Sequence, residues 1–182
     1  LSGQQIQISI LDKPSRTWQR YADIDASRMS ELLDDAPSGI ISVVDAQSSL
    51  IILLNRDDET AHVIRFPELQ HAAWLEDRTT LLAVSAHELN IVSWDLTNPP
   101  MLMLLTRLAE PFTSALFIPR LNAIFYTTPS RLGFIHEDPR IDQEPHTLLE
   151  ADTMEIIGAE PSLSKLMIKK GAQLLSYPLK TP

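Results

Sequence analysis

The sequence predicts an all-β fold made of repeated units of short strands, and a weak repeat of about 41 to 42 residues is the main observation behind this. The best-marked part of the repeat is a pair of apolar runs joined by a short polar turn. It occurs four times, at 40–44 with 51–54, 81–84 with 89–92, 123–126 with 132–135, and 165–168 with 174–177. Repeats of about 40 residues that each contain short strands are typical of β-propellers. We therefore predict a β-propeller segment of about four blades with four antiparallel strands per blade.

Three complete units follow one another, each with strands a to d in chain order. Pro99 and Pro100 cannot donate to a strand ladder, so they mark a connection between strands c and d. The predicted strands are 28–33, 40–45, 50–55 and 62–66 in unit 26–68; 71–76, 80–85, 89–94 and 101–107 in unit 70–108; and 113–118, 122–127, 132–136 and 147–150 in unit 112–151.

Both ends of the array look incomplete. Residues 1–25 fit strands c and d alone, at 5–11 and 17–23, and residues 153–179 fit strands a, b and c, at 154–159, 165–169 and 173–177. An open array leaves apolar faces and strand edges uncovered. We therefore expect residues 1–182 to be one partial propeller domain within a larger propeller, completed by another segment, another chain or a second copy. A four-bladed ring would leave strand 5–11 surplus.

Two segments also suit helices. Residues 26–34 contain good helix formers, and Asp25 or Ser27 could cap a helix there. Residues 101–109 tolerate a helix by propensity. Both helices remain alternatives to strands at this stage.

In period, strand number and turn placement, nearly the whole chain resembles a WD-repeat-type propeller. Trp94-Asp95 stands where that family has its Trp-Asp dipeptide, whereas no Gly-His pair precedes it and Gly is scarce, at 5 residues. The resemblance is architectural and transfers no functional residue.

Composition excludes several functions. The formal net charge of −9 disfavours nucleic acid and anionic membranes as partners. The absence of Cys excludes disulfides and thiolate metal sites but leaves the compartment open. No apolar run reaches 18 residues, so we expect no membrane span. The chain begins at Leu1 without a signal-peptide pattern, and we expect it to be a piece of something longer.

Neither a metal nor a catalytic motif is present. His136-Glu137-Asp138 is the most suggestive cluster, but it lacks the spacing of a zinc or calcium site. No Gly-x-Ser-x-Gly elbow and no Gly-rich phosphate loop occurs. We expect no cofactor, no metal and no enzymatic activity. Trp74 and Trp94 are expected to pack in the core rather than to anchor a partner.

Rigid propellers display variable loops, and such loops mediate recognition. If the strand order is right, the b–c turns and the d–a connections share one face, while the c–d loops lie on the other. The acidic c–d loop at 137–145 is a further candidate contact. The predicted partner-binding residues are Arg28, His71, His87, Glu88, Phe112 and Arg131 on the first face, with Glu110 beside them, and Glu137, Asp138, Arg140 and Asp142 in the loop.

We therefore predict a non-enzymatic protein-interaction or scaffold propeller that acts in a larger multi-domain or multi-subunit assembly. Its partners would be other proteins or the remaining blades. The alternative is a ligand-binding or catalytic propeller with its site in the central channel. That site would need convergent polar side chains at the starts of the a strands, for example at Thr113-Ser114 or His71.

Overall fold

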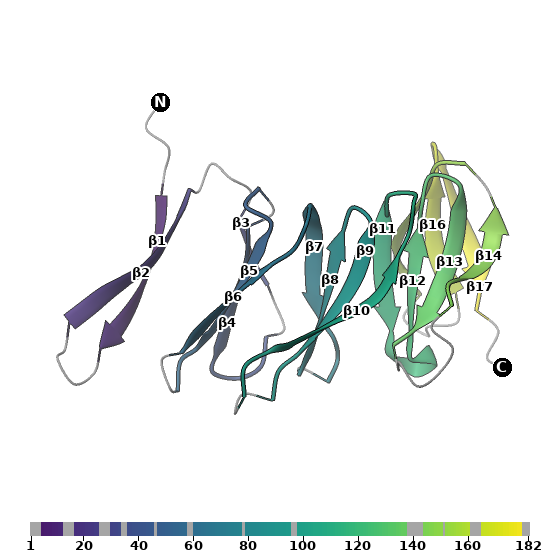
Figure 1. Ribbon diagram of the computed structural model, residues 1–182. Helices are drawn as coiled ribbons and strands as arrows, with labels where there is room; N and C mark the ends of the chain where they lie inside the picture. The colour runs from purple at the N-terminus through teal and green to yellow at the C-terminus, as the bar shows by residue number, and fades with distance from the viewer. Residues whose placement is uncertain are drawn as a thin grey trace. The chain divides into compact units, whose positions relative to one another are not determined.

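The computed structural model describes residues 5–12, 17–25, 30–33, 36–45, 47–57, 60–77, 79–95, 98–137, 144–150, 152–160 and 165–179. Strands make up the regular structure in these ranges, apart from a 3₁₀ turn at Pro119–Leu121 (Figure 1). Among the described residues, no helix has the length and apolar character needed to cross a bilayer.

The strands form five sheets, and within each sheet strands that follow one another in the chain are neighbours (Figure 1). Every strand register that the structure defines is antiparallel. The sheets are β1 (Gln5–Asp12) and β2 (Thr17–Asp25); β3 (Ser30–Leu32), β4 (Ile40–Asp45), β5 (Leu50–Asn55) and β6 (Ala61–Arg65); β7 (Leu69–Trp74), β8 (Thr80–Ser85), β9 (Glu88–Ser93) and β10 (Met101–Arg107); β11 (Ser114–Ile118), β12 (Ala123–Thr127), β13 (Arg131–His136) and β14 (His146–Glu150); and β15 (Met154–Ala159), β16 (Lys165–Lys170) and β17 (Gln173–Pro178).

This strand content confirms the predicted all-β propeller segment. Strands β4, β5, β8, β10 and β15 have the predicted bounds. A helix at 101–109 is wrong, because β10 occupies Met101–Arg107. A helix at 26–34 is also wrong over the described part, because Ser30–Leu32 pairs with β4 and the Leu33 backbone N–H donates to the Ser42 carbonyl at 3.0 Å. Pairing with a neighbouring strand here outweighs local helix propensity.

The chain divides into two compact units, Leu1–Ala83 with Val92–Met101 and Val84–Ile91 with Leu102–Pro182. In the first unit, buried residues of β4 and β5 pack with those of β7 and β8 around Trp74 and Trp94. The indole Nε1 of Trp74 donates to Ser42 Oγ at 2.8 Å, and both residues are buried. This hydrogen bond ties one sheet to the next, and both tryptophans lie in the core as predicted.

In the second unit the core lies between the β11–β14 sheet and the β15–β17 sheet. Ile118, Phe125 and Leu132 of the first sheet pack with Ile156 and Leu166 of the second. This core fixes β11 and β15 side by side, so the turns at their ends have defined positions. Those turns form the candidate site.

Candidate functional site

Four chain segments meet at one end of the strands of the second unit, and we call this surface the turn face. It comprises the β8–β9 turn (86–87), the β10–β11 connection (108–113), the β12–β13 turn (128–130) and the β14–β15 connection (152–153). Backbone hydrogen bonds join them: Leu108 N to His87 O at 3.0 Å, Phe112 N to Ala86 O at 2.7 Å, and Thr153 N to Pro129 O at 3.1 Å. Because b–c turns and d–a connections lie together, the strand order has the geometric consequence expected of it.

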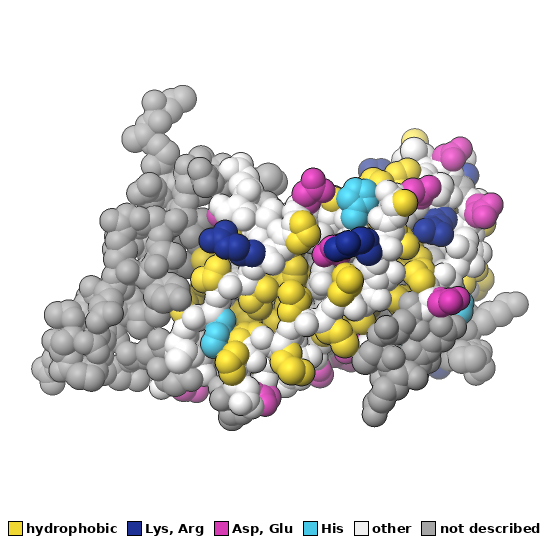
Figure 2. All heavy atoms as spheres, in the orientation of Figure 1, with side chains coloured by type: hydrophobic (Ala, Val, Ile, Leu, Met, Phe, Trp, Pro, Cys, Tyr) yellow, Lys and Arg dark blue, Asp and Glu magenta, His cyan; other side chains and the backbone are white. Residues whose placement is uncertain are grey.

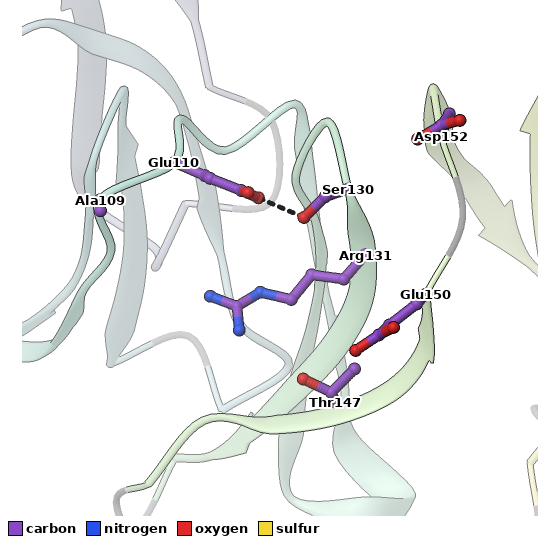
Figure 3. Close-up of a pocket in the computed structure, with 7 residues that line it drawn as sticks. All are labelled: Ala109, Glu110, Ser130, Arg131, Thr147, Glu150 and Asp152. Carbon is purple, nitrogen blue, oxygen red and sulfur yellow. Dashed lines mark hydrogen bonds between the residues drawn. The ribbon is translucent and has the colours of Figure 1, made fainter.

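Glu110 links two of these segments through its side chain. Its carboxylate accepts hydrogen bonds from Ser130 Oγ and from Thr128 Oγ1, each at 2.6 Å (Figure 3). The bonds from Ser130 and then Thr128 lower the pKa of Glu110, against a smaller opposing effect of burial. Glu110 is therefore ionised at neutral pH, and its charge fixes the β10–β11 connection to the β12–β13 turn.

A pocket of about 710 Å³ opens beside this link (Figure 3). The Arg131 side chain extends into it between the Glu110–Ser130 pair and Thr147, and Arg131 Nε is buried without a hydrogen-bond partner among the described residues. We call this the polar pocket; its lining residues are Ala109, Glu110, Ser130, Arg131, Thr147, Glu150 and Asp152.

The buried rings of Tyr126 and Phe112 pack together under the turn face. Both are buried, and their rings meet edge to face with centroids 5.3 Å apart. Burial raises the pKa of Tyr126, and its hydroxyl has no hydrogen-bond partner among the described residues. Gly133 makes room for this ring, because a Cβ there would lie 2.6 Å from the Tyr126 hydroxyl and 2.7 Å from the His146 carbonyl oxygen.

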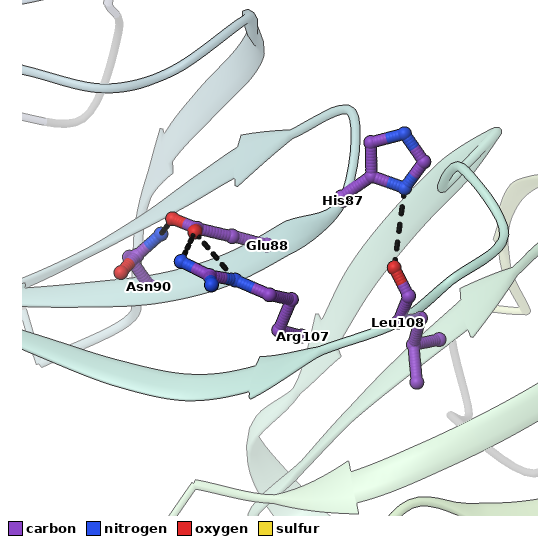
Figure 4. Close-up of polar contacts among 5 residues, drawn as sticks. All are labelled: His87, Glu88, Asn90, Arg107 and Leu108. Carbon is purple, nitrogen blue, oxygen red and sulfur yellow. Dashed lines mark hydrogen bonds and ion pairs between the residues drawn. The ribbon is translucent and has the colours of Figure 1, made fainter.

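His87 and Glu88 play different parts (Figure 4). The Glu88 carboxylate forms an ion pair with Arg107, and Asn90 Nδ2 lies 3.5 Å from it. The Glu88 side chain is only 11% exposed, so this carboxylate joins β9 to β10. His87 is exposed, and its Nδ1 lies 3.1 Å from the Leu108 carbonyl oxygen.

The other predicted partner-binding residues are dispersed. His71 is an exposed residue of β7 in the first unit. Glu137 is half-buried after β13, and its backbone N–H donates to the Asn122 carbonyl at 3.1 Å. Arg28, Asp138, Arg140 and Asp142 lie outside the described residues.

Of the residues predicted on this face, Glu110 and Arg131 line the polar pocket, whereas Phe112 is buried. The sequence analysis did not single out the other polar lining residues, Ser130, Thr147, Glu150 and Asp152. Ser130 and Asp152 lie in a b–c turn and a d–a connection, so the repeat alone could have pointed to them. Thr147 and Glu150 belong to strand β14, and no local signal separates them from other strand residues.

A second pocket, of about 510 Å³, adjoins the first across the Pro129–Thr153 hydrogen bond. Met154 and Pro129 give it apolar walls, and Lys169 Nζ lies 3.9 Å from Glu155 Oε2 at its rim. We call it the apolar pocket; its lining residues are Thr113, Pro129, Thr153, Met154, Glu155, Lys169 and Gly171.

The a-strand hydroxyls expected to line a central channel are engaged in structural contacts. Thr113 Oγ1 lies 2.8 Å from Thr127 Oγ1 and donates to the Met154 carbonyl at 3.1 Å. Ser114 Oγ accepts from the Ile156 backbone N–H at 2.8 Å. These side chains therefore hold β11 to β12 and β15.

Within the described ranges, no group of three or more His, Asp or Glu side chains could hold a metal ion. On the face shown in Figure 2, Lys and Arg side chains are interspersed with acidic and hydrophobic ones rather than gathered together.

No protein-family model and no curated protein sequence matches the chain. Similar solved structures include the β-propeller domain of Cps50 (Swd1) from Myceliophteria thermophila, with a TM-score of 0.59 and 12% identity, covering 84% of this chain and 54% of that one. XC5397 from Xanthomonas campestris, a gluconolactonase, has a TM-score of 0.53 and 13% identity, with 78% and 55% covered. The chain thus spans about half the length of each. At these identities the comparisons show the fold alone, and that fold is a β-propeller.

Proposed function

We propose that this chain is a protein-interaction propeller that binds a partner protein through the turn face, as part of a larger assembly. The observation that supports this most directly is the Arg131 side chain, which extends into the polar pocket (Figure 3). A partner that supplies an acceptor there would bind its guanidinium.

The turn face has the rigidity that recognition needs. Its segments are joined by backbone hydrogen bonds and by the two bonds to Glu110, so little conformational freedom is lost on binding. Polar side chains on turns of a rigid β framework are a frequent arrangement for binding surfaces.

Affinity capture with variants tests the proposal. Arg131→Glu replaces the guanidinium in the polar pocket with a carboxylate, and Glu76→Lys reverses an exposed charge in the first unit. We expect a set of captured proteins that Arg131→Glu loses and that Glu76→Lys retains, with both variants as folded as the parent by circular dichroism. Identical captured sets from all three proteins would contradict a role of this face.

A ligand-binding or catalytic propeller remains the second candidate, favoured by the size of the polar pocket. About 710 Å³ lies within the range of roughly 300–1,000 Å³ that small-molecule sites occupy. A thermal-shift screen of small polar compounds distinguishes the candidates. A specific ligand raises the unfolding temperature by an amount that grows with the logarithm of its concentration above the Kd, whereas an interaction propeller shows no such shift.

A further inference from the structure

We infer that the turn face binds an extended segment of its partner, with a basic side chain in the polar pocket and an aliphatic side chain, two residues away, in the apolar pocket. This inference rests on the proposed function and specifies the partner's chemistry. It is drawn from the two adjoining pockets of unlike polarity, which a single strand of peptide can span.

The two pockets are separated by one residue on each of two segments. Ser130 and Asp152 line the polar pocket, while the adjacent Pro129 and Thr153 line the apolar pocket. Consecutive Cα atoms are about 3.8 Å apart, so the pockets lie within a few residues' reach. In an extended peptide, residues i and i+2 point to the same side about 6.4 to 6.8 Å apart. That spacing suits one side chain in each pocket.

The charges of the polar pocket favour a cation. The pocket is lined by three carboxylates, those of Glu110, Glu150 and Asp152, and by one guanidinium, that of Arg131. Glu110 is held ionised by the hydroxyls of Ser130 and Thr128, and the other two carboxylates are on exposed residues. A Lys or Arg side chain therefore complements the pocket, and the chain's net charge of −9 attracts basic segments.

Arg131 can bind the backbone of the same peptide whose basic side chain enters the polar pocket. Its guanidinium extends into the polar pocket (Figure 3). The backbone of a bound peptide supplies a carbonyl acceptor for such a group at every residue. Arg131 would then bind the peptide backbone, while Glu150 and Asp152 bind the basic side chain.

The apolar pocket has the complementary character. Met154 is buried and Pro129 has no backbone donor, so the walls offer few hydrogen bonds to a polar group. Lys169 and Glu155 neutralise each other at the rim. A Leu, Ile or Met side chain would bury apolar area there at roughly 25 cal/mol per Å².

Selection of random heptapeptides on phage against the immobilised 182-residue chain tests the inference. We expect enriched peptides to contain Lys or Arg two positions from Leu, Ile or Met. Synthetic versions should lose about tenfold in affinity when the basic residue becomes Gln or the aliphatic residue becomes Ala. Enrichment of acidic peptides, or of peptides without a basic residue, would overturn the inference.

Protein variants locate the binding. Glu150→Lys with Asp152→Lys should weaken the selected peptides by about tenfold or more. The matched control, Glu68→Lys with Glu76→Lys, changes two exposed carboxylates of the first unit and should leave affinity unchanged. All four positions are exposed, and circular dichroism checks that both variants fold. Equal affinity for both double variants would overturn the inference.

Different results would contradict the proposed function and the inference about the peptide. If partner capture depends on Arg131 but the selected peptides lack the basic and aliphatic pair, the proposed function stands and the inference is wrong. If no peptide is enriched and capture is independent of Arg131, both are wrong.

Discussion

Glu110 lies in the connection between β10 and β11, which joins one sheet to the next. Both hydroxyl groups that donate to its carboxylate, those of Thr128 and Ser130, belong to the β12–β13 turn. Its lowered pKa means that the folded state favours the ionised form. The stabilisation is therefore full above the ordinary pKa of about 4.3 and is lost as the pH falls through the lower folded value.

We expect Glu110→Gln to reduce the free energy of unfolding at pH 7, with the difference from the parent shrinking below about pH 4. Urea unfolding at several pH values measures this. Burial acts to raise the pKa of Asp77, but hydrogen bonds from Thr80 and Thr79 lower it on balance, so Asp77 also adds to the pH dependence of stability at acidic pH. Asp77 is present in both the parent and the Glu110→Gln variant, so its contribution cancels in the difference between their free energies of unfolding. A difference that stays constant down to pH 3 would show that the charge of Glu110 is not involved.

Tyr126 has a buried hydroxyl without a partner in the described part of the chain. Leaving a buried hydroxyl unsatisfied costs about 1–3 kcal/mol, so removing the hydroxyl should stabilise the folded protein. We expect Tyr126→Phe to raise the free energy of unfolding by about 1 kcal/mol, as measured by chemical denaturation. A loss of stability would mean that the hydroxyl has a partner in solution.

Gly133 is required by packing. A Cβ at this position would lie 2.6 Å from Tyr126 Cζ, and the backbone oxygen of His146 blocks escape at 2.7 Å. Overpacking of this kind costs about 1–3 kcal/mol, and we expect Gly133→Ala to lower the free energy of unfolding by that amount. Parent-like stability in denaturation would show that β14 can move away from β13.

At the scale of the element, the contact between β4 and β7 shows how one sheet holds the next in the first unit. Trp74→Phe removes the indole donor and leaves Ser42 buried without it. We expect a loss of about 2–3 kcal/mol in the free energy of unfolding. Trp94→Phe serves as the comparison, because its Nε1 donates to the Asn98 carbonyl only four residues away. We expect Trp94→Phe to lower the free energy of unfolding by less than Trp74→Phe, because the hydrogen bond it removes is local. A larger loss for Trp94→Phe would contradict the inter-sheet role of Trp74.

Strands were the most predictable elements, since paired apolar runs and turn residues determine them locally. Their ends were less predictable: β12 begins at Ala123 rather than at Asn122, because Asn122 takes a left-handed conformation after the 3₁₀ turn. The site was only partly predictable for a related reason. The Glu110–Ser130 and Pro129–Thr153 contacts link successive repeats, and no pattern within one repeat specifies them.

At the scale of the whole molecule, the last sheet has three strands, and β17 pairs only with β16 among the described residues. Leu174 and Leu175 of β17 are 60% and 38% exposed. Exposed apolar edge strands promote association. In light scattering after size exclusion, we expect an apparent mass that rises above 20.4 kDa with concentration. Leu174→Lys should reduce this rise.

A constant mass of 20.4 kDa at every concentration would contradict this expectation and would indicate that the edge is covered within one molecule. Ser176→Lys on the same strand is the control for added charge. If both lysine variants reduce association equally, charge rather than the apolar side chain is responsible.

The hydroxyl contacts between β11 and β15 join residues 41 and 42 positions apart, which is one repeat length. At this boundary the two sheets are therefore joined through positions that lie one repeat apart. A gene segment that is duplicated or deleted in whole repeats would preserve these contacts, whereas a shift by part of a repeat would break them. At this boundary, a change in length by whole repeats is therefore the one that keeps donor and acceptor in register.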